Sequence, residues 1–220
     1  MLNKDDLAKL EIQTLNPSCV PFSPPFQQVH GAPMNKNDLV GQSAEHVVRH
    51  IVVREKLSWF YLREYNPMED RGDMDHDFSY FEMLRRDGRA FQHGASFVEP
   101  SDTVATGFCS RVITAGGAPS SLGLMDFQVP YEEAKIGAVV DVMRTCGATE
   151  GAILASGNSF HGYGFNLMSR SIWQRFMHLG LLSPLTDTRY IAHRLLEDVG
   201  VLRLSSTSSK PKVPSVVAVF

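Results

Sequence analysis

Four polar residues stand at the ends of predicted strands in the C-terminal half of the chain. Asp126 ends the apolar run LGLM, Ser159 and His161 belong to the turn SGNSFHGYG, and Asp187 stands in SPLTDTRY. A carboxylate that ends an apolar strand is costly unless it is hydrated, paired or bound to a metal ion. Small turn residues allow backbone amides to approach a ligand and hold phosphate oxygens. These residue types therefore point to a cation and to phosphate groups as ligands.

Each of these positions also has a simpler explanation. Asp126 could be an edge residue that faces solvent, and the SGNSFH segment could be an ordinary Gly-Asn hairpin turn. Asp187 precedes a predicted helix, where an aspartate is a good N-cap. The residue types alone leave these readings open.

A third reading is a serine hydrolase built on Ser159 and His161. The segment GNSFH imitates a nucleophile elbow, but His161 occupies the place of the closing glycine. Such an enzyme would also need an acid paired with His161 and an oxyanion hole. The sequence has no GxxxxGK[ST] motif and no GxGxxG after a strand, so Walker-type and Rossmann readings lack support.

The composition describes a globular protein. The chain has 220 residues, 43% of them hydrophobic and 20% charged, which excludes a disordered chain, a collagen-like fibre and a coiled coil. No apolar run approaches the roughly 20 residues that span a membrane. The charged N-terminus predicts neither a signal nor a transit peptide. The cysteines form no CxxC pair, so we expect a reducing, cytoplasmic setting. They are Cys19, Cys109 and Cys146.

The net charge of −3 argues against dominant, non-specific electrostatic binding to nucleic acid. A local basic site remains possible, because electrostatic attraction depends on where the charges lie. Basic residues recur between positions 189 and 212. We therefore look for a local basic site in this segment.

Residues 1–103 are predicted to form a mainly helical N-terminal region. Residues 16–38 are rich in Pro, Ser, Asn and Gln and predict a long loop. Ser43 could cap a helix that runs to about Glu64, and a second helix is predicted over residues 78–86. This region could contact partner proteins.

Residues 104–220 are predicted to form an α+β domain. Apolar alternation, turn residues and one amphipathic helix near residues 130–147 give the order β-β-α-β-β-α-α-β-β. A mixed or antiparallel sheet with flanking helices is the natural packing of these elements.

The last part of this domain supplies two basic candidates. Arg203 alternates with Leu202 and Leu204 in a predicted strand, so it faces the other side of that strand. A buried guanidinium requires a partner, which predicts a polyanionic ligand or a carboxylate beside it. Lys210 follows a run of small polar residues suited to a mobile loop that orders over a triphosphate.

The succession of these motifs resembles the archaeo-eukaryotic primase superfamily, the primase-polymerases, over about residues 105–220. MDFQ occupies the place of the family's first acidic motif and SFH that of its Ser-x-His motif. The Thr-Asp pair occupies the place of the third motif, and LRLSSTSSKPK that of the closing Arg-bearing strand and basic loop. The primase 1D-like branch is the nearest match.

The resemblance implies a nucleotidyltransferase of the DNA or RNA primase-polymerase type, with a role in DNA replication. Asp126 and Asp187 would bind Mg²⁺ or Mn²⁺ and position the attacking 3′-hydroxyl. We therefore expect the two residues on neighbouring strand ends, close enough to share a cation, although about 60 residues separate them.

The remaining motif residues would bind the substrate. The resemblance implies that Ser159 and His161 contact the phosphates of the incoming nucleotide, that Arg203 holds the triphosphate or the template, and that Lys210 adds a phosphate contact. The implied partners are nucleoside triphosphates and single-stranded or primed nucleic acid.

One residue departs from the family's pattern. The first motif usually carries a second carboxylate, and here that position is Gln128. Two divalent metals usually need several carboxylate oxygens to offset their charge. The alternative function is therefore a catalytically weak or inactive module that binds nucleotide or nucleic acid within a larger complex.

Overall fold

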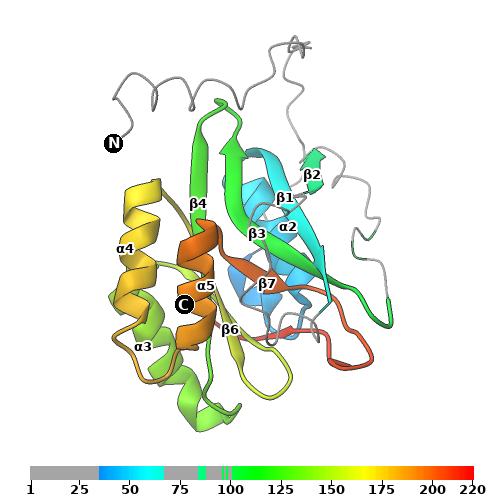
Figure 1. The fold of residues 1–220 in the computed structure, drawn as a ribbon, viewed down its shortest axis with the longest axis vertical. Coiled ribbons are helices and arrows are strands. Elements are labelled where there is room, and N and C mark those ends of the chain that lie inside the picture. Colours follow the sequence, from blue (N-terminus) through cyan, green and yellow to red (C-terminus); the bar gives the residue numbers. More distant parts are fainter. Residues whose placement is uncertain (1–34, 67–83, 88–95, 97, 99–100) are drawn as a thin grey trace, which may run out of the picture. The chain divides into compact units, whose positions relative to one another are not determined.

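The computed structural model describes residues 35–66, 84–87, 96, 98 and 101–220. Its helical elements and strands appear in Figure 1. The helical elements are η1 (Lys36–Leu39), α2 (Ala44–Arg54), η4 (Glu133–Lys135), α3 (Ile136–Cys146), α4 (Arg170–Gly180) and α5 (Thr188–Glu197). The strands are β1 (Leu57–Tyr65), β2 (Leu84–Asp87), β3 (Ala105–Thr114), β4 (Pro119–Asp126), β5 (Gly151–Ala155), β6 (Phe160–Met168), β7 (Val201–Arg203) and β8 (Ser215–Val219).

The strands form one sheet of eight strands in the order β2-β1-β3-β4-β6-β5-β8, with β7 paired to β3. Each of the strand pairings in this sheet is antiparallel. The fold is therefore α+β, and from residue 104 onward the elements follow the predicted order. The amphipathic helix predicted from Pro130 starts later, as a 3-10 turn at Glu133 that leads into α3.

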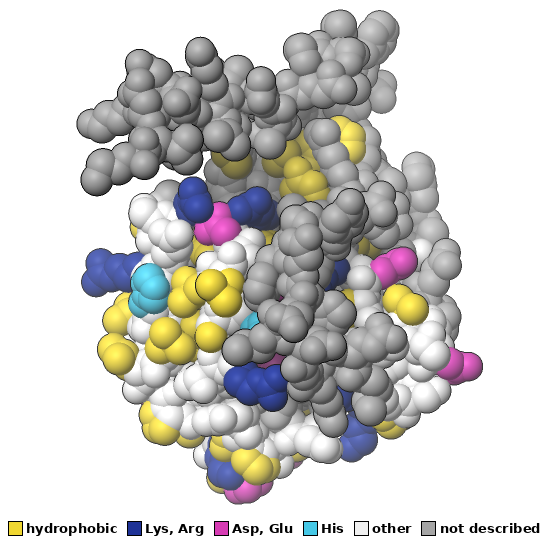
Figure 2. Space-filling model, viewed as in Figure 1, with side chains coloured by type: hydrophobic (Ala, Val, Ile, Leu, Met, Phe, Trp, Pro, Cys, Tyr) yellow, Lys and Arg dark blue, Asp and Glu magenta, His cyan; other side chains and the backbone are white. Residues whose placement is uncertain are grey.

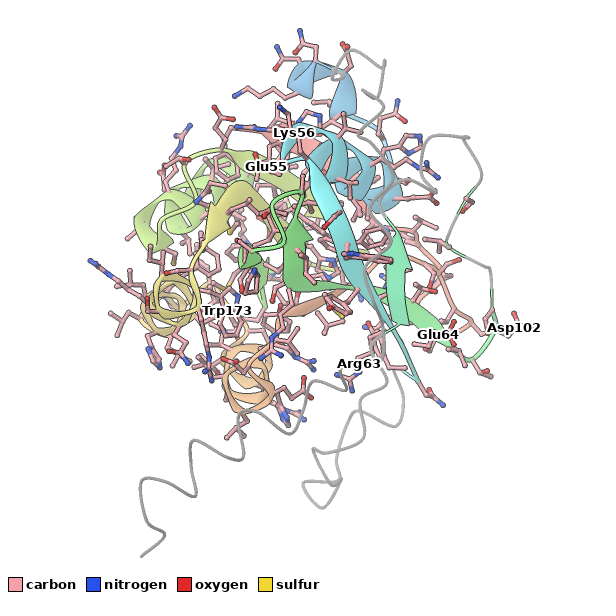
Figure 3. The ribbon with its side chains drawn as sticks, turned by 90° about the horizontal axis from the view of Figure 1, so that it is seen from above. Glu55, Lys56, Arg63, Glu64, Asp102 and Trp173 are labelled. Atoms are coloured by element: carbon pink, nitrogen blue, oxygen red, sulfur yellow. The ribbon has the colours of Figure 1, made fainter. Side chains whose placement is uncertain are left out.

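The two faces of the sheet bury two separate apolar cores. Leu124 and Leu154 belong to the core that α2 covers, whereas Met125 and Ile153, one position along each strand, belong to the core formed with α3, α4 and α5. Alternation of this kind is expected where both faces of a strand are buried. Figure 3 shows α2 on one side of the strands and α4 and α5, with Trp173, on the other.

The first helix is shorter than predicted. It ends at Arg54, Lys56 adopts a left-handed backbone (φ 50°), and the chain continues as β1 instead of remaining helical to Glu64. The segment LSWFYLRE is rich in aromatic residues, which favour strands. Its apolar positions fit both the helical repeat of about 3.6 residues and the strand repeat of about two residues. Pairing with β3, which lies about 50 residues further along the chain, selects the strand.

The structure describes only part of the region for which a second helix and a Pro-rich loop were predicted. Residues 84–87 form strand β2 instead of the end of a helix, while residues 78–83 lie outside the described chain. Residues 16–34 of the predicted Pro-rich loop are also outside it. β1 and β3 share one sheet and both belong to the compact unit Ala32–Phe220, so the sheet crosses the boundary expected between residues 103 and 104.

Strand β7 lies where β3 and β4 separate. β3 pairs with β4 at Arg111–Ile113 and with β7 at Gly107–Cys109. Gly200, directly before β7, donates its amide to Ser110 Oγ (2.8 Å), and a Cβ there would meet Leu124 of β4 at 3.5 Å. The chain therefore enters β7 between β3 and β4, which carries Arg203 toward the end of β4. In the described part of the chain, no helix is long and apolar enough to cross a membrane.

Candidate functional site

The centre of the candidate site is a pair of residues on neighbouring strands. Asp126 ends β4 and stands opposite His161 of β6 in the antiparallel register. The distance from His161 Nε2 to Asp126 Oδ1 is 3.6 Å. The side chain of His161 is 8% exposed and that of Asp126 is 28% exposed, so the carboxyl group is partly open to solvent. The strand pairing thus joins the first predicted motif to the second.

Asp187 lies directly beside Asp126 through the backbone. The amide of Asp187 donates to the carbonyl of Asp126 at 2.9 Å, and Phe127 and Thr186 form an isolated β-bridge. The carboxylate of Asp187 also caps α5, since its Oδ1 accepts the amide of Tyr190 at 3.0 Å. Asp187 therefore caps α5 and also lies beside Asp126.

Burial and charge shift the ionisation of both central residues. Burial raises the pKa of Asp126 to about 7, and the negative charge of Asp187 adds to the effect, while Lys210 and Arg203 oppose it. Burial lowers the pKa of His161 to about 3, and the charges of Arg203 and Lys210 lower it further. At neutral pH the site thus combines a neutral imidazole, two acidic side chains and two nearby cations.

Three buried polar atoms around this pair have no hydrogen-bond partner within the described chain. They are Asp126 Oδ1, His161 Nδ1 and Tyr163 Oη. Buried polar atoms in native proteins are almost always hydrogen-bonded, to protein, ordered water or a ligand. Tyr163 was not among the sequence candidates. The signal available for it was its place two residues after His161 in a strand, which puts both side chains on one face.

Ser159 closes the hairpin turn between β5 and β6. The amide of Ser156 donates to the carbonyl of Ser159 at 2.9 Å, and the two hydroxyl groups are 3.1 Å apart. Gly157 has φ 123°, a conformation that glycine adopts without strain. The hydroxyl of Ser159 thus bonds Ser156, and no hydrogen bond joins it to His161 among those described, which gives the serine hydrolase reading no geometric support.

Arg203 is buried, as expected, but its partners differ from those expected. Its Nη1 donates to the carbonyls of Ser205 and Lys212, the latter at 2.9 Å, and its Nη2 donates to the carbonyl of Ser156 at 2.7 Å. The guanidinium is thus hydrogen-bonded to three backbone carbonyls, and no carboxylate is among its hydrogen-bond partners in the described chain; the predicted polyanionic ligand stays a prediction. Lys210 is exposed, in a tight turn whose amides at Thr207 and Lys210 bond each other's carbonyls at 3.0 Å.

Gln128 fastens the neighbouring loop to the end of β4. Its Nε2 donates to the carbonyl of Pro184 at 3.1 Å, and its amide donates to the carbonyl of Leu185 at 3.0 Å. The side chain is exposed. The residue that replaces a carboxylate in the motif therefore helps to hold the segment that carries Asp187.

The donor set fits a single divalent cation better than two. No group of three or more His, Cys, Asp and Glu side chains within the described ranges could hold a metal ion. Asp126 and Asp187 supply carboxylate oxygens, the ligands that Mg²⁺ prefers, and Mg²⁺ commonly takes its other ligands from water and substrate phosphates. The buried, unpartnered Oδ1 of Asp126 is consistent with such an ion.

The described charges on the visible face of the molecule are mixed in sign. Figure 2 shows basic and acidic side chains interspersed, with hydrophobic groups over α4 and α5. This arrangement agrees with the low net charge of the chain.

A comparison with protein families identifies the class. The family model for archaeo-eukaryotic primase 1D-like proteins matches residues 90–215, which is more than half of the chain. The protein therefore belongs to the archaeo-eukaryotic primase 1D-like family, as the motif order and the α+β fold indicated. Neither the comparison with curated proteins nor that with solved structures gave a significant match.

Proposed function

We propose that this protein is a metal-dependent nucleotidyltransferase that adds nucleotides to a nucleic-acid strand. The observation that carries the proposal is the position of Asp126. It stands beside His161 in the register, is bonded to Asp187 through the backbone, and lies within the electrostatic influence of Arg203 and Lys210. Acidic side chains next to basic ones suit a cation together with a triphosphate.

In the proposed reaction, the acidic side chains bind the metal ion and the basic or neutral ones bind the phosphates. Asp126 and Asp187 would hold a Mg²⁺ or Mn²⁺ ion, which neutralises charge on the phosphates when it is bound. His161, neutral at physiological pH, can donate one ring N–H to a phosphate oxygen. Lys210 reaches solvent and can neutralise charge on the same group. Phosphoryl transfer depends mainly on such positioning and charge stabilisation.

Gln128 favours a second candidate function, a module that binds nucleotide without turning it over. Its side chain fastens the loop through Pro184 and contributes no carboxylate. With two acidic side chains, the site can bind a metal–nucleotide complex and still lack the second cation that many polymerases use.

Primer extension and calorimetry on the same protein separate the two functions. The full chain would be tested with Mn²⁺ or Mg²⁺, ribo- or deoxynucleoside triphosphates, and a primed template. Asp126→Asn is the test variant, and Asp141→Asn, at an exposed position of α3, is its matched control.

Three outcomes are informative. Extension by the wild type and by Asp141→Asn, but not by Asp126→Asn, supports the transferase. Triphosphate binding that Asp126→Asn weakens, without extension under any condition, supports the binding module. Absence of both binding and extension contradicts both functions.

A further inference from the structure

We propose that Arg203 is a positioning residue that locks the Lys210 loop (residues 205–212) onto the β5–β6 turn, and that it does not itself contact the nucleotide. The family resemblance suggested a direct contact with triphosphate or template. The catalytic consequence rests on the proposed function, whereas the structural role of Arg203 does not.

The hydrogen bonds of Arg203 join two segments that are far apart in sequence. Nη1 donates to the carbonyl of Ser205 and to that of Lys212, so it binds both ends of the Lys210 loop. Nη2 donates to the carbonyl of Ser156, 47 residues away, in the turn that leads to Ser159. One side chain therefore closes the loop and attaches it to the turn.

The chemistry of the guanidinium suits this role. Its planar fork presents several donors in fixed directions, and hydrogen bonds from a charged donor are stronger than neutral ones. The side chain is buried, with the whole residue 6% exposed. Nη1 donates to two carbonyls and Nη2 to one, so three of the five N–H donors of the guanidinium are used in holding the loop and the turn.

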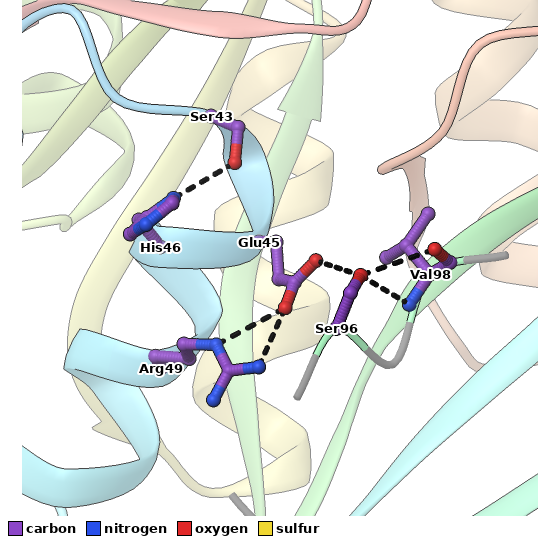
Figure 4. A network of polar contacts seen from close by, with 6 residues as sticks. All are labelled: Ser43, Glu45, His46, Arg49, Ser96 and Val98. Carbon is purple, nitrogen blue, oxygen red and sulfur yellow. Dashed lines mark hydrogen bonds and ion pairs between the residues drawn. The ribbon is translucent and has the colours of Figure 1, made fainter. Parts of the chain in front are cut away.

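One side of the Lys210 loop borders a cavity. Ser205, Ser206 and Val213 line a cavity of about 190 Å³ together with Leu204 and residues of α2 and its surroundings. Glu45, also on this cavity, is bound by Arg49 and by the hydroxyl of Ser96, as Figure 4 shows. A loop that borders a cavity depends more on polar bonds for its conformation than one packed against a core.

A few other bonds hold the same loop. The hydroxyl of Ser205 accepts the amide of Thr106 at 2.9 Å, and the amide of Ser208 donates to the carbonyl of Asp102 at 3.0 Å. Neither of these bonds reaches the β5–β6 turn. Among the described hydrogen bonds, only those of Arg203 join the loop to that turn, so we expect the position of Lys210 relative to Ser159 to change when Arg203 is replaced.

Amide hydrogen exchange on the nucleotide-free full chain tests this role directly. The informative amides are hydrogen-bonded ones in the two joined segments, namely Ser156, Thr207, Ser208 and Lys210. In Arg203→Lys we expect exchange at least about tenfold faster at these four amides, because the single ammonium of lysine cannot replace two separate nitrogens that reach the loop and the turn at the same time. The reference amides are Gly151 and Phe220, which bond each other's carbonyls and should not change.

The variants distinguish positioning from direct contact. Positioning predicts that Arg203→Lys loses as much transfer activity as Arg203→Ala, while Lys210→Ala loses nucleotide affinity with normal exchange at Ser156. Arg175→Lys, on the exposed surface of α4, is the control for an arginine replacement. If Arg203→Ala does not fold, Arg203→Lys alone distinguishes positioning from direct contact, because lysine retains the charge and the apolar stem.

Two results would overturn the proposal. One is unchanged exchange at all four amides in Arg203→Lys. The other is an equal acceleration at the reference amides, which would mean a global loss of stability. A wild-type protein without transfer activity would contradict the proposed function. The structural role of Arg203 would then be decided by the hydrogen-exchange result alone.

Discussion

The amide of Asp187 donates to the carbonyl of Asp126 at 2.9 Å, so the two acidic residues of the site are joined through the backbone. The same Asp187 carboxylate caps α5 by accepting the amide of Tyr190. Asp187 therefore caps a helix, and under the proposed function the same carboxylate also holds the cation. Substitutions can separate these two roles.

Asp187→Asn should preserve folding and abolish metal-dependent transfer. Asparagine caps helices about as well as aspartate, but it lacks the negative charge that a cation requires. Asp187→Ala should lose transfer and also about 0.5–2 kcal/mol of stability. Urea unfolding and primer extension measure the two effects.

Ser169→Ala is the matched control for this experiment. Ser169 caps α4 by accepting the amide of Ile172 at 3.4 Å. Its removal should destabilise the protein without a loss of nucleotide binding. Equal transfer by the wild type and Asp187→Asn would exclude a role for this carboxylate in cation binding.

Asp126→Asn should become more stable relative to the wild type as pH rises from about 4 to about 7. Between the ordinary pKa of 3.8 and the folded value of about 7, folded Asp126 keeps a proton that the unfolded chain has lost. Rising pH therefore favours unfolding of the wild type, and asparagine removes this effect. Because the side chain is partly exposed, we expect a change of about 2 kcal/mol.

Urea titrations of both proteins at several pH values measure this difference. His161 contributes in the opposite direction, since its pKa is lowered from 6.5 to about 3 and its neutral folded form gains stability as pH rises through that range. His161→Gln should therefore lose stability relative to the wild type over the same interval. A pH-independent difference for Asp126→Asn would contradict the assigned environment of Asp126.

Lys210→Ala should weaken triphosphate binding about tenfold or more, as expected for a lost charge-assisted hydrogen bond. The loss should shrink at high salt, because Lys210 is exposed and its charge is screened. Lys212→Ala is the control, since Lys212 is also exposed and Arg203 binds its backbone carbonyl only. Calorimetry at two salt concentrations decides the question, and equal losses in both variants would count against a specific contact.

Gln128→Asp should bind Mn²⁺ severalfold more tightly than the wild type. The substitution adds a carboxylate two residues from Asp126, and affinity for hard cations rises with the number of charged ligands. Gln128→Asn shortens the side chain equally without the charge and serves as the control. Unchanged Mn²⁺ affinity in Gln128→Asp would mean that position 128 does not face the cation.

Gly107→Ala should destabilise the protein by about 1–3 kcal/mol and reduce transfer. Gly107 stands opposite Arg203 in the register, and a Cβ there would lie 2.5 Å from Val201 Cγ1. The clash would push β7 from β3 and displace Arg203. Gly137→Ala, in α3, where a Cβ meets nothing within 4 Å, should cost no stability. Thermal unfolding of the two variants makes the comparison.

The amino-acid sequence by itself determined the features that depend on local patterns. Hydrophobic periodicity and turn residues were sufficient for the order of elements after residue 104, because each element carries its own period. The turn at SGNSFH and the N-cap at Asp187 could be predicted for the same reason, since both are closed by residues a few positions apart. The order of the motifs placed the chain in its family.

The tertiary structure alone decided the features that depend on distant partners. The apolar pattern of the aromatic segment in β1 is compatible with a helix and with a strand. It forms a strand because its backbone pairs with β3. Arg203 binds carbonyls because β7 lies beside β3, where the guanidinium reaches Ser156 and the Lys210 loop. Tyr163 joins the site through strand pairing. Contacts between residues tens of positions apart leave no periodic trace along the chain, so only the assembled sheet reveals them.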